Sequence, residues 1–138
     1  NLDIKDINSI RNTIDIVKRN KMMDNAVITG CNKAMVNEVR KCCTKIPILL
    51  NAEKFSEFEK LDYELFVKKT CQDAIISSCV GININYKDCR NELIEYARLR
   101  CLSVCVWTID NEEDMKKYIE MGVDWITTNN VKTLISLK

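Results

Sequence analysis

The residues of this chain best suited to chemistry are Asp3 and Lys5, which stand two positions apart near its start. They belong to a strand-length run that alternates apolar and charged residues, so both side chains are expected to point to one face. Leu2 and Ile4 then point to the opposite face. A carboxylate and an ammonium group on an inward face must be paired, bound to a metal or solvated. The pattern predicts either a charged reacting centre or a solvated ion pair.

A second group of polar side chains lies where the other predicted strands end: Thr29, Asn83, Asn85, Trp107, Thr108, Asp110, Thr128 and Asn129. In parallel α/β folds, active sites are built at the C-terminal ends of the strands. Each residue taken singly has a structural interpretation, because asparagine forms turns and tryptophan fills cores. Together they would line one rim around an aromatic ring. The group predicts a site for a small ligand and not a nucleic-acid surface.

The clearest of the elements that must position these residues is the stretch 104–128. It reads as a buried strand, an amphipathic helix with three acids in its first turn and an inner stripe of Met115, Tyr118 and Ile119, a glycine, and a second buried strand. The helix macrodipole favours acids in that first turn, and Gly122 suits the left-handed conformation that ends a helix. The stretch therefore predicts one strand–helix–strand unit of a parallel sheet.

The same alternation extends along the whole chain. Strands are predicted at 2–5, 26–29, 46–50, 80–85, 102–108 and 123–128, and helices at 7–17, 32–43, 55–78, 88–97, 112–121 and 131–137. Asn32 and Asp88 are expected to cap the second and fourth helices. Nearly every strand reads as apolar on both faces, as in sheets that are covered on both sides. This order predicts an α/β fold with a parallel sheet, either open and doubly wound or part of an eight-stranded barrel.

Composition narrows the class of protein. The chain has 138 residues, about one domain by length, with 46% hydrophobic and 30% charged residues and a net charge of +1. No basic surface for nucleic acid is predicted, and no apolar run approaches the roughly 18 residues of a transmembrane helix. The eight cysteines include no Cys-x-x-Cys pair, and the chain has no histidine. They are predicted to be reduced, buried thiols of a cytoplasmic protein, with a disulfide or metal site as the alternative.

The chain resembles the glycerophosphodiester phosphodiesterase family in several segments that follow the family order. The matching segments are the strand 1–5, Asn83 and Tyr86 ahead of Glu92-Leu93-Ile94, V-W-T-I-D at 106–110, and G-V-D-W-I-T-T-N at 122–129. The resemblance implies a TIM (β/α)8 barrel of the phospholipase C-like phosphodiesterase type. This chain would be a single domain, 1–138, holding strands three to eight as an incomplete barrel of about six parallel strands.

The resemblance also implies an activity for the full-length protein, the metal-dependent hydrolysis of glycerophosphodiesters to glycerol 3-phosphate and an alcohol. Asp3 corresponds to a family ligand for a divalent metal, Mg²⁺ or Ca²⁺, and Lys5 to the catalytic lysine that neutralises phosphate charge. Trp107 and Asn83 would bind the small-molecule substrate, Trp107 as a pocket wall and Asn83 by a hydrogen bond. The family histidines and further carboxylates would precede Asn1, so these residues alone are not expected to perform the reaction.

Departures from the family pattern support an alternative function. Asp3 stands in place of a glutamate, Thr29-Gly30-Cys31 in place of Ser-Ser-Phe, and Trp125 in place of a glycine. These changes fit a divergent enzyme, and they equally fit an inactive member that binds a phosphate ligand or serves as an interaction domain. Because six strands do not close a barrel, missing N-terminal units or a partner are expected to complete it, which allows a homo-oligomer. An unrelated α/β domain would instead have an open sheet with Trp107 away from any cleft.

Overall fold

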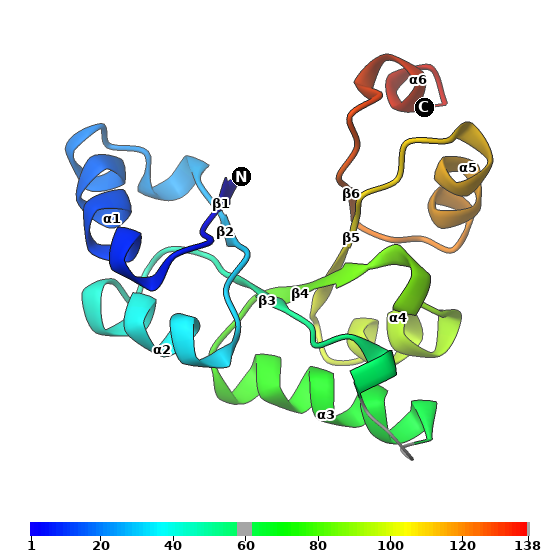
Figure 1. Cartoon of the computed structure of the whole chain (residues 1–138), viewed down its shortest axis with the longest axis horizontal. Coiled ribbons are helices and arrows are strands. Elements are labelled where there is room, and N and C mark those ends of the chain that lie inside the picture. Colours follow the sequence, from blue (N-terminus) through cyan, green and yellow to red (C-terminus); the bar gives the residue numbers. More distant parts are fainter. Residues whose placement is uncertain (58–61, 138) are drawn as a thin grey trace.

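The computed structural model describes residues 1–57 and 62–137, and among them the chain forms a parallel α/β fold (Figure 1). The strands are β1 (Leu2–Asp3), β2 (Ile28–Thr29), β3 (Leu49–Asn51), β4 (Gly81–Asn85), β5 (Ser103–Trp107) and β6 (Trp125–Ile126). They pair in sequence order and always in parallel, with β2 joined to β3 by a single bridge between Ile28 and Ile48. The predicted alternation of parallel strands and helices is confirmed.

Each strand is followed by a helix, and each helix but the last returns the chain to the start of the next strand. The helices are α1 (Ile10–Arg19), α2 (Lys33–Cys42), α3 (Tyr63–Ile76), α4 (Asn91–Arg98), α5 (Glu112–Glu120) and α6 (Val131–Ser136). Short 3-10 turns stand at Ile7–Ser9 (η1), Met23–Asn25 (η2), Phe55–Glu57 (η3) and Tyr86–Asp88 (η4). Residues 58–61 of the predicted helix 55–78 lie outside the described residues. None of the helices described is long and apolar enough to cross a membrane.

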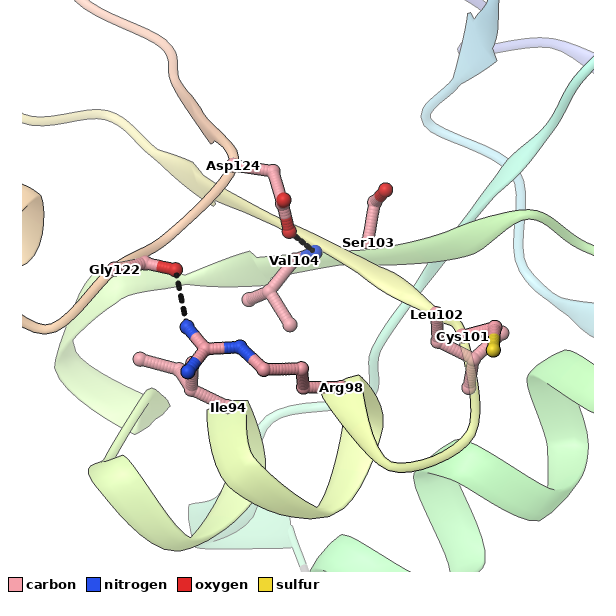
Figure 2. Close-up of a pocket in the computed structure, with 8 residues that line it drawn as sticks. All are labelled: Ile94, Arg98, Cys101, Leu102, Ser103, Val104, Gly122 and Asp124. Atoms are coloured by element: carbon pink, nitrogen blue, oxygen red, sulfur yellow. Dashed lines mark hydrogen bonds between the residues drawn. The ribbon is translucent and has the colours of Figure 1, made fainter.

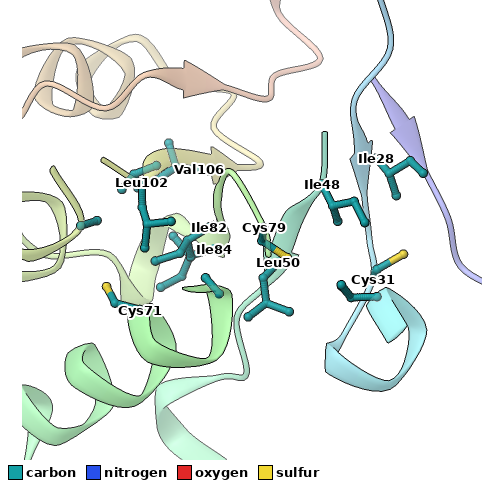
Figure 3. Close-up of a cluster of buried hydrophobic side chains, with 14 of the residues drawn as sticks. Ile28, Cys31, Ile48, Leu50, Cys71, Cys79, Ile82, Ile84, Leu102 and Val106 are labelled. Carbon is teal, nitrogen blue, oxygen red and sulfur yellow. The ribbon is translucent and has the colours of Figure 1, made fainter. Parts of the chain in front are cut away.

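The two faces of the sheet differ in character, which corrects the expectation of strands that are apolar on both faces. One face packs against the helices and carries only apolar strand residues, drawn in Figure 3: Ile28, Ile48, Leu50, Ile82, Ile84 and Val106. The residues that alternate with them point to the other, inner face. There a small apolar cluster of Val27, Leu49 and Cys105 gives way to polar side chains toward the C-terminal ends of the strands. The period of two along each strand thus separates core from candidate site.

Two predictions about helices are wrong. Asp88 does not cap α4, because it is the last residue of the turn η4. The helix α4 begins after Arg90, which provides no side-chain cap. Ile119, expected on the buried stripe of α5, is 39% exposed, whereas Met115 and Tyr118 are buried as predicted. By contrast, the Asn32 side chain accepts from the backbone N–H of Met35 and caps α2 as expected.

Candidate functional site

Asp3 and Lys5 form an ion pair at the end of β1. Lys5 Nζ lies 2.7 Å from Asp3 Oδ2, and the side chain of Lys5 is 76% exposed and that of Asp3 51%. This geometry matches the solvated pair that the sequence allowed, and such exposed pairs contribute little to stability. The Asp3 carboxylate is nevertheless on the inner face, opposite Thr29 in the parallel register. The catalytic and metal-binding roles of the two residues stay predictions.

Gly30 allows the end of β2 to lie against Asp3. Its φ is +79°, and a Cβ added there would stand 2.2 Å from Asp3 Oδ1 and 2.5 Å from the backbone oxygen of Ile4. The left-handed conformation and the missing side chain are both needed for this approach. The glycine therefore sets the position of the carboxylate relative to β2.

Asn51 links three strands at the same level of the sheet. Its Oδ1 accepts from the backbone N–H of Gly30 at 3.1 Å and from Nδ2 of Asn83 at 2.6 Å. Asn83 lies directly opposite Asn51 in the register and is only 7% exposed. We call Asp3, Gly30, Asn51 and Asn83 the polar layer, because they connect β1 to β4 across the inner face.

Asp3 and Asn83 are predictable from the sequence as site residues, whereas Asn51 and the role of Gly30 are not. The third strand was predicted to end at Leu50, whereas β3 extends one residue further. The signal that identifies Asn51 is its place two residues after Leu49, which puts both on one face of the strand. The hydrogen bond that joins it to Asn83, 32 positions away, has no local signal in the sequence.

Trp107 ends β5 opposite Asn85 in the register, on the same inner face as Asn83. Its ring is partly buried, and its Nε1 is buried without a hydrogen-bond partner among the described residues. Asn85 has a structural task, because its Oδ1 accepts from the backbone N–H of Lys87 and begins the turn η4. The substrate-binding roles predicted for Trp107 and Asn83 remain untested predictions.

Three other predicted rim residues bind one another. Asp110 Oδ1 accepts from the backbone N–H of Asn129 at 2.7 Å and from Thr128 Oγ1 at 3.2 Å, while Oδ2 accepts from Asn129 Nδ2 at 3.1 Å. These hydrogen bonds, that of the Asn129 backbone first, lower the pKa of the Asp110 carboxyl. The cluster fastens the loop after β5 to the loop after β6. Its polar atoms are engaged in holding the rim together.

Cys31, next to Gly30, does not supply a thiolate to this region. Its side chain is fully buried, and burial first, with the neighbouring Cys79 and Asp3 adding to the effect, raises the pKa of the thiol to about 11. A neutral, buried thiol is a poor nucleophile and a poor ligand at neutral pH. Hydrolysis at this site would therefore have to use oxygen or nitrogen groups.

These residues provide only part of a binding site for a divalent cation. In the ranges 1–57 and 62–137, no three His, Cys, Asp or Glu side chains are grouped closely enough to hold a metal. Asp3 offers the hard oxygen that Mg²⁺ and Ca²⁺ prefer, but one of its oxygens is paired with Lys5. The described residues thus fit the role of contributing one ligand and do not fit that of a complete metal centre.

Two hollows are lined by none of the polar-layer residues. A groove of about 690 Å³ runs between β6 and α6 and is lined mainly by apolar residues, among them Ile119, Trp125 and Leu134. It explains the exposure of Ile119, which faces this groove and not the core. Trp125 on its wall is 44% exposed.

The second hollow, of about 230 Å³, lies at the N-terminal ends of the strands, beside the residues that begin β5 and β6 (Figure 2). Its charged groups are bound to backbone: Arg98 donates to the Gly122 oxygen at 3.2 Å, and Asp124 accepts from the Val104 N–H at 2.8 Å. These bonds hold α4 and β6 to their neighbours. We assign this hollow a structural role.

Comparison with known proteins identifies the relatives of this chain. The model of the glycerophosphoryl diester phosphodiesterase family matches residues 4–133. A glycerophosphodiester phosphodiesterase of Caldanaerobacter subterraneus subsp. tengcongensis is 24% identical over 124 residues, which are 90% of this chain and 46% of that protein. The chain therefore spans about half the length of this relative.

Solved structures give the same picture for the fold. A glycerophosphodiester phosphodiesterase from Parabacteroides distasonis matches with a TM-score of 0.74 and 21% identity, over 95% of this chain and 50% of that one. A phosphodiesterase from Oleispira antarctica, solved with the product sn-glycerol-3-phosphate, matches with a TM-score of 0.76 and 13% identity, over 95% of this chain and 49% of that one. The predicted fold is confirmed as the incomplete barrel, not an open doubly wound sheet.

Proposed function

This chain belongs to the glycerophosphoryl diester phosphodiesterase family, and we propose that its full-length protein hydrolyses glycerophosphodiesters to glycerol 3-phosphate and an alcohol with the help of a divalent cation. The observation that carries the proposal is the polar layer together with Lys5, which sets a carboxylate, a lysine and two amides toward the C-terminal ends of neighbouring parallel strands. That is the edge at which barrel enzymes build their sites. A relative was solved with sn-glycerol-3-phosphate bound, which supports this choice of ligand.

In this proposal Asp3 and Lys5 act at the phosphate. Asp3 is one ligand of Mg²⁺ or Ca²⁺, and a bound cation of this kind supplies polarisation of a phosphodiester oxygen. The Lys5 ammonium neutralises charge on the phosphate oxygens, for which its long and exposed side chain has the reach. Pairing of the two groups in the free protein keeps both charges balanced until the anionic substrate arrives.

The remaining parts of the site complete the assignment. Trp107 forms a wall of the pocket, and Asn83 contributes a hydrogen bond to the substrate. The other metal ligands and the acid and base of the reaction come from residues outside this chain's described ranges. A cytoplasmic location is part of the proposal, because free thiols favour a reducing compartment.

The proposal is tested by hydrolysis of a glycerophosphodiester by the full-length protein and its Asp3→Asn variant. The variant keeps the shape of the side chain and loses the anionic oxygen, so we expect a fall of about 100-fold in kcat/KM, the scale of losing one electrostatic contact to the reacting centre. The matched control is Asp15→Asn, on the outer helix α1, which should retain the full rate. Unimpaired hydrolysis by Asp3→Asn would reject the role of Asp3.

One observation favours the alternative of a phosphate-binding member without activity. The described residues bring no three metal-binding side chains together, and the carboxylate of the polar layer, Asp3, is already paired with Lys5. A full-length protein that binds sn-glycerol 3-phosphate but shows no turnover of any glycerophosphodiester would establish this alternative.

A further inference from the structure

The orientation of the Asn51 amide is fixed by its neighbours. The backbone N–H of Gly30 can only donate, so the Asn51 atom that faces it at 3.1 Å must be the oxygen. The same oxygen lies 2.6 Å from the Asn83 amide, which must therefore present its NH2 group. One backbone donor therefore fixes the orientation of both side-chain amides.

This arrangement leaves one donor group and one acceptor unused on two neighbouring strands. The NH2 group of Asn51 and the Oδ1 atom of Asn83 have no hydrogen-bond partner among the residues that the structure describes. Asn51 is partly exposed, and the two residues stand directly opposite each other on adjacent strands. A donor and an acceptor are thus held together on the inner face of the sheet.

The chemistry of the pair selects its ligand. A phosphate oxygen could accept from Asn51 but would be repelled by Asn83 Oδ1, and a cation would be repelled by the Asn51 NH2 group. A hydroxyl group suits both, because it accepts one hydrogen bond and donates another. Gly30 connects the pair to Asp3, so the hydroxyl belongs to a molecule whose charged end lies near Asp3 and Lys5.

We propose that Asn51 is a specificity-determining residue, which together with Asn83 binds a hydroxyl on the polyol part of a phosphorylated ligand. This inference rests on the proposed function and adds to it the residue that distinguishes a polyol phosphate from a simple alkyl phosphate. The competing interpretation is that Asn51 only fastens β2 to β4. The two differ in whether its NH2 group matters, since fastening uses the oxygen alone.

The test is calorimetric binding of sn-glycerol 3-phosphate and of propyl phosphate, which lacks both hydroxyls, to the full-length protein. We expect the native protein to prefer sn-glycerol 3-phosphate by about tenfold, the value of one to two neutral hydrogen bonds. Asn51→Asp keeps an acceptor for Gly30 and Asn83 but replaces the donor that faces the ligand hydroxyl by a second acceptor, so the hydroxyl can donate to only one of the two oxygens. The preference should fall to about threefold, the value of the one hydrogen bond that remains, whereas the Tm should stay unchanged.

The matched control is Asn32→Asp, which adds the same charge at the start of α2 and keeps its capping acceptor. Using the ratio of two affinities cancels the general effect of that charge on anionic ligands, so the control should keep the tenfold preference. Equal binding of both phosphates by the native protein, or an unchanged preference in Asn51→Asp, overturns the inference and leaves the proposed function standing. Failure to bind either phosphate rejects the proposed function, and this inference with it.

Discussion

At the scale of single residues, Gly30 determines how closely the carboxylate of Asp3 approaches β2. We predict that Gly30→Ala destabilises the protein by more than the 1–2 kcal/mol that a left-handed alanine costs by itself, because the new Cβ also meets Asp3 Oδ1 and the Ile4 oxygen. Chemical denaturation measures the loss. Gly122→Ala is the matched control, with φ +77° but only the flexible end of Arg98 nearby. Equal losses in the two variants would contradict the close packing at Gly30.

Asp110 gives a prediction about pH. Its folded-state pKa is lowered by the backbone and side-chain donors of Asn129 and by Thr128, so its contribution to stability is present above the unfolded-state pKa of about 3.9. That contribution is lost as the pH falls through the lower folded value. We expect Asp110→Asn to unfold with a weaker pH dependence below about pH 4 than the native protein. Identical pH profiles would contradict the assignment.

The sequence predicts which residues belong to the site better than it predicts the contacts between them. Asp3 and Asn83 were identified because they alternate with apolar residues on short strands. Their connection through Asn51 and Gly30 depends on backbone groups and on residues 21 to 32 positions apart, which no local pattern encodes. The ion pair between Asp3 and Lys5 was foreseen as one of two outcomes, because spacing alone does not reveal whether a charged face is solvated.

At the scale of elements, α5 depends on Asn111, the residue that precedes it and caps its start. Asn111 accepts from the backbone N–H of Asp114 at 2.8 Å and donates to its carboxylate at 2.6 Å. We predict that Asn111→Ala lowers the free energy of unfolding by about 1 kcal/mol, as the loss of a helix cap does. Asp88→Ala serves as the control and should change stability little, since Asp88 caps no helix. A larger effect from Asp88→Ala would contradict the boundaries of η4 and α4.

The order of elements was predictable from hydrophobic periodicity, but their ends were not. The unit 104–128 has an acid-rich helix start and a glycine stop, and both lie in the structure where they were predicted. The prediction that Asp88 caps a helix is wrong because an aspartate ahead of an apolar stripe is also typical of a 3-10 turn. The prediction that Ile119 is buried is wrong because its helix borders an open groove. Periodicity along one helix does not indicate such a feature of the tertiary structure.

At the scale of the whole molecule, the sheet is open at both edges. In the described residues β1 pairs only with β2 and β6 only with β5, and the chain spans about half the length of the relatives it matches. The apolar groove beside β6 lies at one of these edges. The described residues therefore form an incomplete barrel with the polar layer on its inner face.

The most direct measurement is the release of sn-glycerol 3-phosphate from a glycerophosphodiester by the full-length protein, before and after removal of metal with EDTA. We expect release before chelation, its loss after chelation, and its return when Mg²⁺ or Ca²⁺ is added in excess. Release that continues unchanged in EDTA would contradict the metal-dependent function assigned to Asp3 and its surroundings.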